Sequence, residues 1–164
     1  MQPIKNYTSD IPIERIFAEL QQTLAVHGAK QIAFDYGDDG KVHGVTFVVP
    51  TGGRLLSVKL PARVKNAQAL LKQQWDANLI SHKRGAEKTY GFEQAYRVAW
   101  RNILDWVQAQ MALLDIGMVK LEEVFLPYVV YRDGKTLYEY YEHRGFQLPS
   151  GEPNGTAHEG KVID

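Results

Sequence analysis

The chain has 164 residues, no cysteine, and 19 basic residues balanced by 19 acidic ones. This length suits one domain with a substantial core, and the absence of cysteine excludes disulfides, thiolate metal sites and cysteine nucleophiles. The zero net charge excludes a histone-like polycation, no window approaches the ~20 apolar residues of a membrane span, and the first residues show no secretory signal pattern. We therefore expect a cytoplasmic protein of mixed secondary structure.

The N-terminal region divides into a leader and a helix. Residues 1–9 are polar and aperiodic, which predicts a flexible leader. Apolar residues then recur at helical spacing from Ile13 to Leu24, and Gly28 is a favourable helix terminator. The pattern predicts a first helix over residues 11–27, with Asp10 as its N-terminal cap.

Three strands are predicted after this helix. Apolar and polar residues alternate over residues 31–36, and β-branched residues are frequent over 42–49 and 55–60. An Asp-Gly pair and a Gly-Gly pair supply turn residues between these segments. The order predicts an antiparallel meander of three strands.

Helical periodicity returns after Pro61. It predicts a second helix that ends near Trp75, followed by a polar loop of low order over residues 76–91. Apolar residues then recur every three or four positions over about 92–115, which predicts a long amphipathic helix.

The C-terminal region is predicted as short elements and a tail. Residues 118–126 have the pattern of a short helix, and an extended piece near 128–131 is a candidate addition to the sheet. Thr136 and Glu139 have capping-box spacing and open a last helix that ends near residue 144. Residues 147–164 contain little to bury and are predicted to be disordered.

Together these elements predict an α+β fold with an N-terminal helix, a three-stranded antiparallel meander, and later helices of which the long one packs on the sheet. We expect residues 10–146 to form a single domain. Leu104, Trp106 and Leu113 lie outside the main apolar stripe of the long helix. Either a homodimer or the packing of three helices within the monomer would cover them.

Catalytic and metal-binding motifs do not stand out in the sequence. The five histidines never pair at metal-ligand spacing. Asp35, Asp38 and Asp39 could hold Mg²⁺, but the Asp-Asp-Gly sequence is also what a tight turn favours. The Gly-Lys-Thr sequence at 134–136 lacks the upstream glycine of a phosphate-binding loop, and no serine lies in a nucleophile elbow. We expect no catalytic residues, no metal and no cofactor.

The uneven distribution of charge is the most informative functional signal. From Lys59 to Arg101 there are nine basic and three acidic residues, so this stretch carries a net charge of +6. A basic surface can bind phosphates, and an aromatic residue among the cations can stack on an unpaired base. The alternative is that these cations are solvated side chains scattered around two helices. The candidate nucleic-acid-binding residues are Lys65, Lys72, Lys83, Arg84, Lys88, Tyr90 and Arg97.

A second candidate surface would bind a protein partner. It combines aromatic and acidic residues near the C-terminal end of the domain, although tyrosines more often cover the end of a core with their hydroxyls in water. The residues concerned are Tyr138, Tyr140, Tyr141, Glu122 and Glu123.

Several segments resemble a family of small bacteriophage proteins. They are the hairpin FDYGDDGKVHGVTFVV, the sequence KLPA, the run QAYRVAWRNILDWVQAQMALLDIGMVKLEEVFLPYVV, and DGKTLYE. The resemblance covers about residues 10–145. Members of this family tend to be encoded in the early, replication and recombination part of phage genomes, and none has an established activity. The resemblance therefore implies a phage origin and a role near DNA metabolism, and it supplies no catalytic residues.

These observations lead to two functional expectations. The first is a non-catalytic phage-encoded accessory protein of the host bacterial cytoplasm that binds single-stranded or recombining DNA. The alternative is a phage protein that inhibits or recruits a host factor, as an anti-defence protein does. Binding to DNA through phosphate contacts weakens steeply as salt rises, whereas a protein complex held by apolar contacts resists salt.

Overall fold

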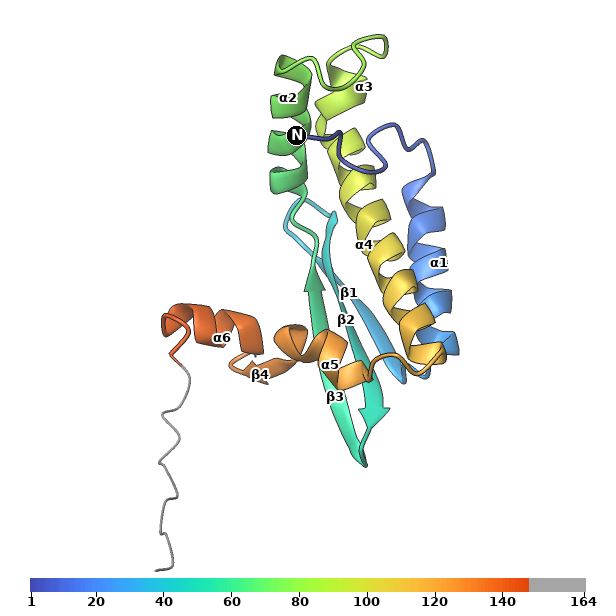
Figure 1. Cartoon of the computed structure of the whole chain (residues 1–164), viewed down its shortest axis with the longest axis vertical. Helices are drawn as coiled ribbons and strands as arrows, with labels where there is room; N and C mark the ends of the chain where they lie inside the picture. The colour runs from blue at the N-terminus through green and yellow to red at the C-terminus, as the bar shows by residue number, and fades with distance from the viewer. Residues whose placement is uncertain (148–164) are drawn as a thin grey trace, which may run out of the picture.

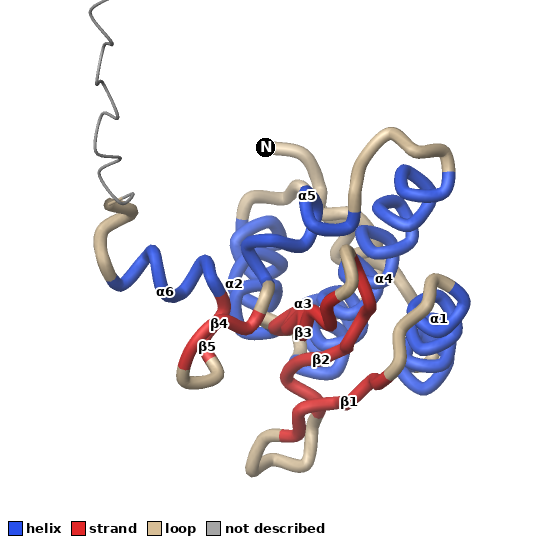
Figure 2. The backbone as a smooth tube through the Cα atoms, turned by 90° about the horizontal axis from the view of Figure 1, so that it is seen from below, coloured by secondary structure: helices blue, strands red, loops and turns tan. Residues whose placement is uncertain are grey.

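The computed structural model describes residues 1–147 (Figure 1). The fold is α+β, as predicted: an N-terminal helix, a three-stranded antiparallel sheet, and then helices. Helices α1 and α4 lie on the same side of the sheet (Figure 2). The predicted disordered tail falls outside the described residues except at Gln147.

The first helix, α1 (Ile13–Val26), buries Ile16, Leu20 and Leu24. The prediction that Asp10 caps this helix is wrong. The helix begins after Pro12 without a side-chain cap, and the Asp10 carboxylate instead pairs with Arg84. An ion pair to a distant loop has replaced the local hydrogen bonds that the sequence suggested.

The sheet has the order β1-β2-β3, with β1 (Gln31–Tyr36), β2 (Val42–Thr51) and β3 (Arg54–Pro61). Its alternation places Val45, Phe47 and Val49 in the core, because successive side chains of a strand point to opposite faces. Phe47 lies opposite Val58 of β3 in the register, so the two buried rows meet on one face.

Two helices and a loop follow the sheet. Helix α2 (Val64–Asp76) packs beside α4 (Phe92–Asp115), the longest element of the fold. The segment predicted as a loop of low order contains a short helix, α3 (Glu87–Tyr90). Thr89 explains the difference, because its side chain is buried and its hydroxyl donates a 2.7 Å hydrogen bond to the Gly85 carbonyl oxygen.

Two of the three apolar residues that lie off the main stripe of α4 are covered within the chain. Leu104 is fully buried, and the Trp106 ring packs edge-on against Phe125 with ring centroids 5.5 Å apart. The chain itself therefore supplies the cover for Leu104 and Trp106 that a second copy could have provided.

The C-terminal elements are α5 (Leu121–Phe125), the 3₁₀ turn η1 (Leu126–Tyr128), β4 (Val130–Arg132), β5 (Lys135–Thr136) and α6 (Leu137–His143). Strand β4 pairs with β5 in a separate two-stranded sheet, and Val129 forms an isolated bridge to Val58 of β3. The extended piece near 128–131 thus touches the main sheet without joining it as a full strand.

The capping box that opens α6 is confirmed. The Glu139 backbone N–H donates to the Thr136 hydroxyl at 3.2 Å, and the Thr136 backbone N–H donates to the Glu139 carboxylate at 2.8 Å. The pKa of Glu139 is lowered chiefly by this backbone N–H, with the charges of Lys59 and Arg63 acting in the same direction.

The leader makes specific contacts with α2 and α4. The buried Gln74 side chain accepts a hydrogen bond from the Ile4 backbone N–H at 2.9 Å and donates one to the Gln2 carbonyl oxygen at 2.8 Å. The Gln94 amide donates to the carbonyl oxygens of Tyr7 and Ser9. Residues 1–9, for which the sequence predicts a flexible leader, are thus held at four points by two glutamines.

Candidate nucleic-acid interface

The seven candidate nucleic-acid-binding residues lie on α2, the α2–α3 loop, α3 and the first turns of α4. These elements lie side by side in the upper half of Figure 1. Two residues are on α2, two in the loop, two on α3, and one on α4. In that order they are Lys65 and Lys72, Lys83 and Arg84, Lys88 and Tyr90, and Arg97.

Three of these cations face solvent without a carboxylate partner. Lys65, Lys83 and Lys88 are exposed, and within residues 1–147 none has an acidic oxygen within 4.0 Å. Solvated, unpaired ammonium groups of this kind are free to exchange water and counterions for phosphate oxygens.

Lys72 and Tyr90 are already engaged with their neighbours. The Lys72 ammonium lies 2.6 Å from the Asp76 carboxylate, and this hydrogen bond is the main reason that the pKa of Lys72 is raised. The same ammonium lies 5.8 Å from the Tyr90 ring centroid, and the Tyr90 ring packs edge-on against Trp75 at 5.7 Å. Tyr90 is therefore part of a local cluster and does not present an open face for stacking.

Arg84 and Arg97 are engaged with other side chains of the protein. Arg84 pairs with Asp10 and its side chain is only 28% exposed. Arg97 is partly buried and donates a 2.7 Å hydrogen bond to the Gln94 side-chain oxygen. The sequence could not show the Arg84 ion pair, because Asp10 is far from Arg84 along the chain.

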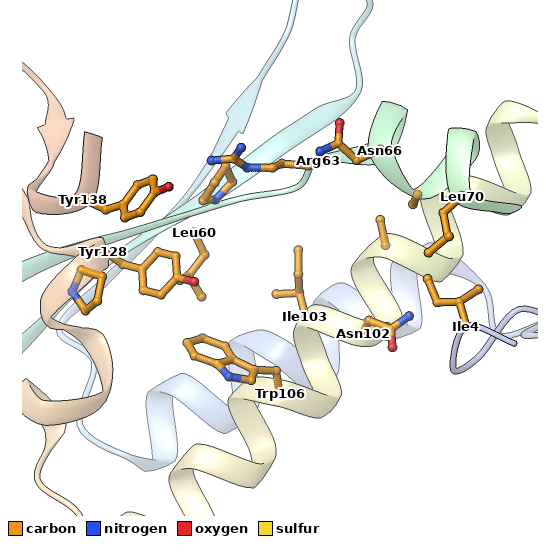
Figure 3. Close-up of a pocket in the computed structure, with 14 residues that line it drawn as sticks. Ile4, Leu60, Arg63, Asn66, Leu70, Asn102, Ile103, Trp106, Tyr128 and Tyr138 are labelled. Atoms are coloured by element: carbon orange, nitrogen blue, oxygen red, sulfur yellow. The ribbon is translucent and has the colours of Figure 1, made fainter. Parts of the chain in front are cut away.

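A cavity of about 640 Å³ lies next to α2, between α2, α4 and the C-terminal elements (Figure 3). Its volume is within the range of small-molecule sites. The apolar part of its wall includes Leu60, Leu70 and Ile103, together with the aromatic rings of Trp106 and Tyr128. The polar part is Arg63, Asn66, Asn102 and the Tyr138 side chain.

The first turn of α2 adds positive charge at the mouth of this cavity. Arg63 is the N-cap residue and makes no side-chain capping hydrogen bond, and the first turn contains no acidic residue. Cations are unfavourable at this end of a helix, because the unpaired backbone N–H groups already carry partial positive charge. Arg63 and Lys65 therefore strengthen the positive potential where acidic residues would have stabilised the helix.

The residues of this cavity were not found from the sequence. Arg63 was counted among the nine cations of the basic stretch, but no signal singled it out. Asn66, Asn102 and Tyr128 come from three different elements, and no motif joins them. Trp106 is the one lining residue that the sequence indicated as unusual, since it lies off the main apolar stripe of the long helix.

The acidic cluster of the first hairpin has the contacts of a turn. Asp39 accepts a hydrogen bond from the Lys41 backbone N–H at 3.0 Å, which is the largest reason for its lowered pKa, and its carboxylate also contacts the His43 ring. Asp35 accepts from the Thr46 hydroxyl at 3.1 Å. Within the described part of the chain no group of three His, Cys, Asp or Glu residues is placed to hold a metal ion.

The three tyrosines of the second candidate surface all lie on α6. Tyr138 is 40% exposed, and the Tyr140 and Tyr141 rings are in edge contact with centroids 5.7 Å apart. The two acidic residues have local roles. The Glu122 carboxylate accepts a hydrogen bond from Thr51, and Glu123 accepts one from the Lys120 backbone N–H at 2.8 Å.

Comparison with known proteins adds no relative. No family model, no curated protein and no solved structure matches this chain. Among the helices of residues 1–147, none is both long and apolar enough to cross a membrane.

Proposed function

We propose that this protein binds single-stranded DNA along α2, through Arg63 and Lys65 at the first turn of this helix and Lys83 and Lys88 beyond its last turn. We refer to these four residues as the α2–α3 surface. The observation that carries the proposal is that none of the four has a carboxylate within 4.0 Å in the described residues, although all lie on or next to packed elements. The partners of Lys65, Lys83 and Lys88 are expected to come from outside the chain.

The expected strength of this interaction follows from the number of cations. Each phosphate neutralised on a single strand contributes about −0.7 to the slope of log affinity against log salt. Four contacts therefore predict a slope of about −3. This is moderate binding, which suits an accessory protein that meets DNA transiently.

The proposed role is that of a non-catalytic accessory protein in phage DNA replication or recombination. The resemblance of residues 10–145 to early-region phage proteins supports this setting. Single strands are the exposed intermediates of both processes, and a protein that binds their backbone has a substrate in either.

Fluorescence anisotropy of a labelled thymine oligonucleotide of about 15 nucleotides, within the site sizes of known single-strand binders, tests the proposal. We expect binding at about 50 mM salt that weakens with the slope given above. The triple variant Lys65→Ala, Lys83→Ala, Lys88→Ala should bind much more weakly and with a slope reduced by about 2.

The matched control is Lys30→Ala. Lys30 is exposed and lies in the turn between α1 and β1, and Figure 1 shows this turn at the end of α1 that is remote from α3. The Lys30→Ala variant should bind the oligonucleotide with the same affinity as the unmodified protein. Absence of binding at about 50 mM salt, or an equal loss in Lys30→Ala, would refute the proposal.

A second candidate function is the binding of a host or phage protein. The observation that favours it is a group of exposed aromatic residues on β4, α6 and the residues after it. Tyr131 packs against Tyr140 at 5.0 Å, and Tyr138 packs against Phe146 at 5.6 Å. A salt-resistant partner retained by the full chain, and lost in Tyr131→Ser with Tyr138→Ser, would favour this function over DNA binding.

A further inference from the structure

The cavity beside α2 combines three kinds of group. Figure 3 shows Trp106, Tyr128 and Tyr138 toward one end of the cavity and Asn66 and Asn102 toward the other, with the Arg63 side chain extending from α2 toward the aromatic end. The three aromatic residues come from α4, η1 and α6, and the two asparagines from α2 and α4. The fold therefore brings together residues from four elements.

The aromatic end is held in place by packing behind it. The Trp106 ring contacts Phe125 edge-on at 5.5 Å and Tyr128 at 5.6 Å, with interplanar angles of 84° and 63°. Phe125 is fully buried and fixes this arrangement from the core side. A ring that is supported in this way offers a planar apolar surface without a large entropic cost on binding.

The polar groups retain hydrogen-bonding capacity. The Asn102 amide N–H groups donate to the carbonyl oxygens of Lys5 and Val98, which leaves its side-chain oxygen as an acceptor. The Asn66 side chain is exposed and has no hydrogen-bond partner within residues 1–147. Arg63 is exposed, and no carboxylate in that range lies within 4.0 Å of it.

We propose that this cavity binds unpaired nucleobases of the strand held by the α2–α3 surface. One base would lie against the Trp106 and Tyr128 rings, and the edge of the next base along the strand would bond to the side chains of Asn66 and Asn102 at the other end of the cavity. Arg63, at the mouth, would contact the adjacent phosphate. This inference rests on the proposed function, since the strand must first be held.

The combination of groups favours a base over other occupants. A purely aliphatic ligand would cover Asn66 and Asn102 without satisfying them, which is costly for polar groups removed from water. A phosphate alone would use Arg63 and leave the aromatic end unoccupied. A nucleotide has a planar face, a polar edge and an anion, and so matches all three kinds of group.

A DNA strand would have only a short path from the cavity to Lys65. Arg63 and Asn66 at the cavity, and Lys65 on the neighbouring surface, all belong to the start of α2. A chain that passes over this turn can reach both the cavity and the lysine. Base stacking on an aromatic residue is sequence-tolerant, so we expect little preference among the four bases.

The test compares two strands and two variants in the full chain. One probe is the labelled thymine oligonucleotide, and the other is the same strand with abasic sites at its central positions. Stacking of a base on a protein aromatic ring predicts that the intact strand binds about 5- to 100-fold tighter. Asn66→Ala, whose side chain is exposed and unbonded, should reduce this ratio without affecting the fold.

Trp106→Phe is the second variant and should also lower the ratio, while circular dichroism checks that it folds. Lys65→Ala provides the contrast, because it should weaken both strands equally and leave the ratio unchanged. A pattern in which Asn66→Ala and Trp106→Phe change the ratio and Lys65→Ala does not would support the base site.

Equal affinity for intact and abasic strands would overturn the base site and leave the proposed DNA binding intact. Failure of both strands to bind at about 50 mM salt would overturn both proposals. Anilinonaphthalene sulfonate, a fluorescent probe of apolar surfaces, tests the alternative that the cavity takes an apolar partner. If it binds in a Trp106-dependent manner and the oligonucleotide does not displace it, the cavity takes an apolar partner and the inference is wrong.

Discussion

The most specific structural prediction concerns Gln74 and the attachment of the leader. Gln74 is 1% exposed and makes two hydrogen bonds to the leader backbone, from Ile4 at 2.9 Å and to Gln2 at 2.8 Å. Gln74→Ala removes both. Since a typical intramolecular hydrogen bond contributes about 0.5–1.5 kcal/mol net, we expect the free energy of unfolding to fall by about 1–3 kcal/mol.

The loss falls in the lower half of this range if water replaces Gln74 at the Ile4 N–H and the Gln2 carbonyl oxygen. It falls in the upper half if these two groups stay buried without a partner. For a domain of this size each kcal/mol lowers the melting temperature by about 2–4 °C. Urea unfolding followed by circular dichroism measures the free energy, and hydrogen exchange of the Ile4 amide reports the local effect. Exchange at Ile4 should be slow in the unmodified protein and fast in Gln74→Ala.

Gln73→Ala is the control on the same helix. Gln73 is exposed, and its side chain makes no hydrogen bond in the described part of the chain. Because alanine is the better helix former, this variant should be unchanged or slightly more stable. The reasoning fails if Gln74→Ala and Gln73→Ala differ by less than about 0.5 kcal/mol, the effect expected for an ordinary surface change.

Three further predictions test the packing and the helix ends. Phe125→Ala should lower the free energy of unfolding by about 3–5 kcal/mol in chemical denaturation, because the ring is fully buried, and a loss below 1 kcal/mol would contradict its place in the core. Gly91→Ala should lower the melting temperature, because a Cβ there would lie 2.3 Å from the Glu87 carbonyl oxygen, whereas an unchanged melting temperature would show that α3 and α4 are not joined this tightly. The folded-state pKa of Glu139 is below its ordinary value of 4.5, so its charged form stabilises the fold above that pH and the contribution is lost as pH falls through the lowered pKa. Glu139→Gln should therefore flatten the loss of stability in acid, measured by melts across that range, and an unaltered pH profile would exclude this role.

Local patterns in the sequence were sufficient to predict the main elements. The long helix was predicted over 92–115 and is observed at Phe92–Asp115, because its apolar repeat is sustained over many turns. The hairpins were predicted from turn residues and alternation, and the capping box of Thr136 from its spacing. Each of these signals lies within a few residues of the structure that it specifies.

Contacts between distant segments were not predictable in the same way. Asp10 has the right residue type for a cap, but Arg84 offers it an ion pair across the fold. The leader looked unstructured because its partners, Gln74 and Gln94, are polar residues buried on later helices. A buried glutamine gives no periodic signal, since it is identical in sequence to a solvated one.

The candidate site shows the same difference between local sequence signals, which are predictable, and contacts between distant segments, which are not. The charge count located a basic stretch in the sequence, but it could not separate solvated cations such as Lys65 from paired ones such as Lys72. Pairing depends on where the acidic residues fall in space. The cavity was missed because its lining comes from elements far apart in the chain.

Mapping of backbone amide shifts by NMR upon addition of a thymine oligonucleotide tests DNA binding at the α2–α3 surface most directly. We expect the largest shift changes over residues 63–67 and 82–90, and little change near Lys30 or in the hairpin between β2 and β3. Changes centred on α6, or an absence of change at low salt, would contradict the account.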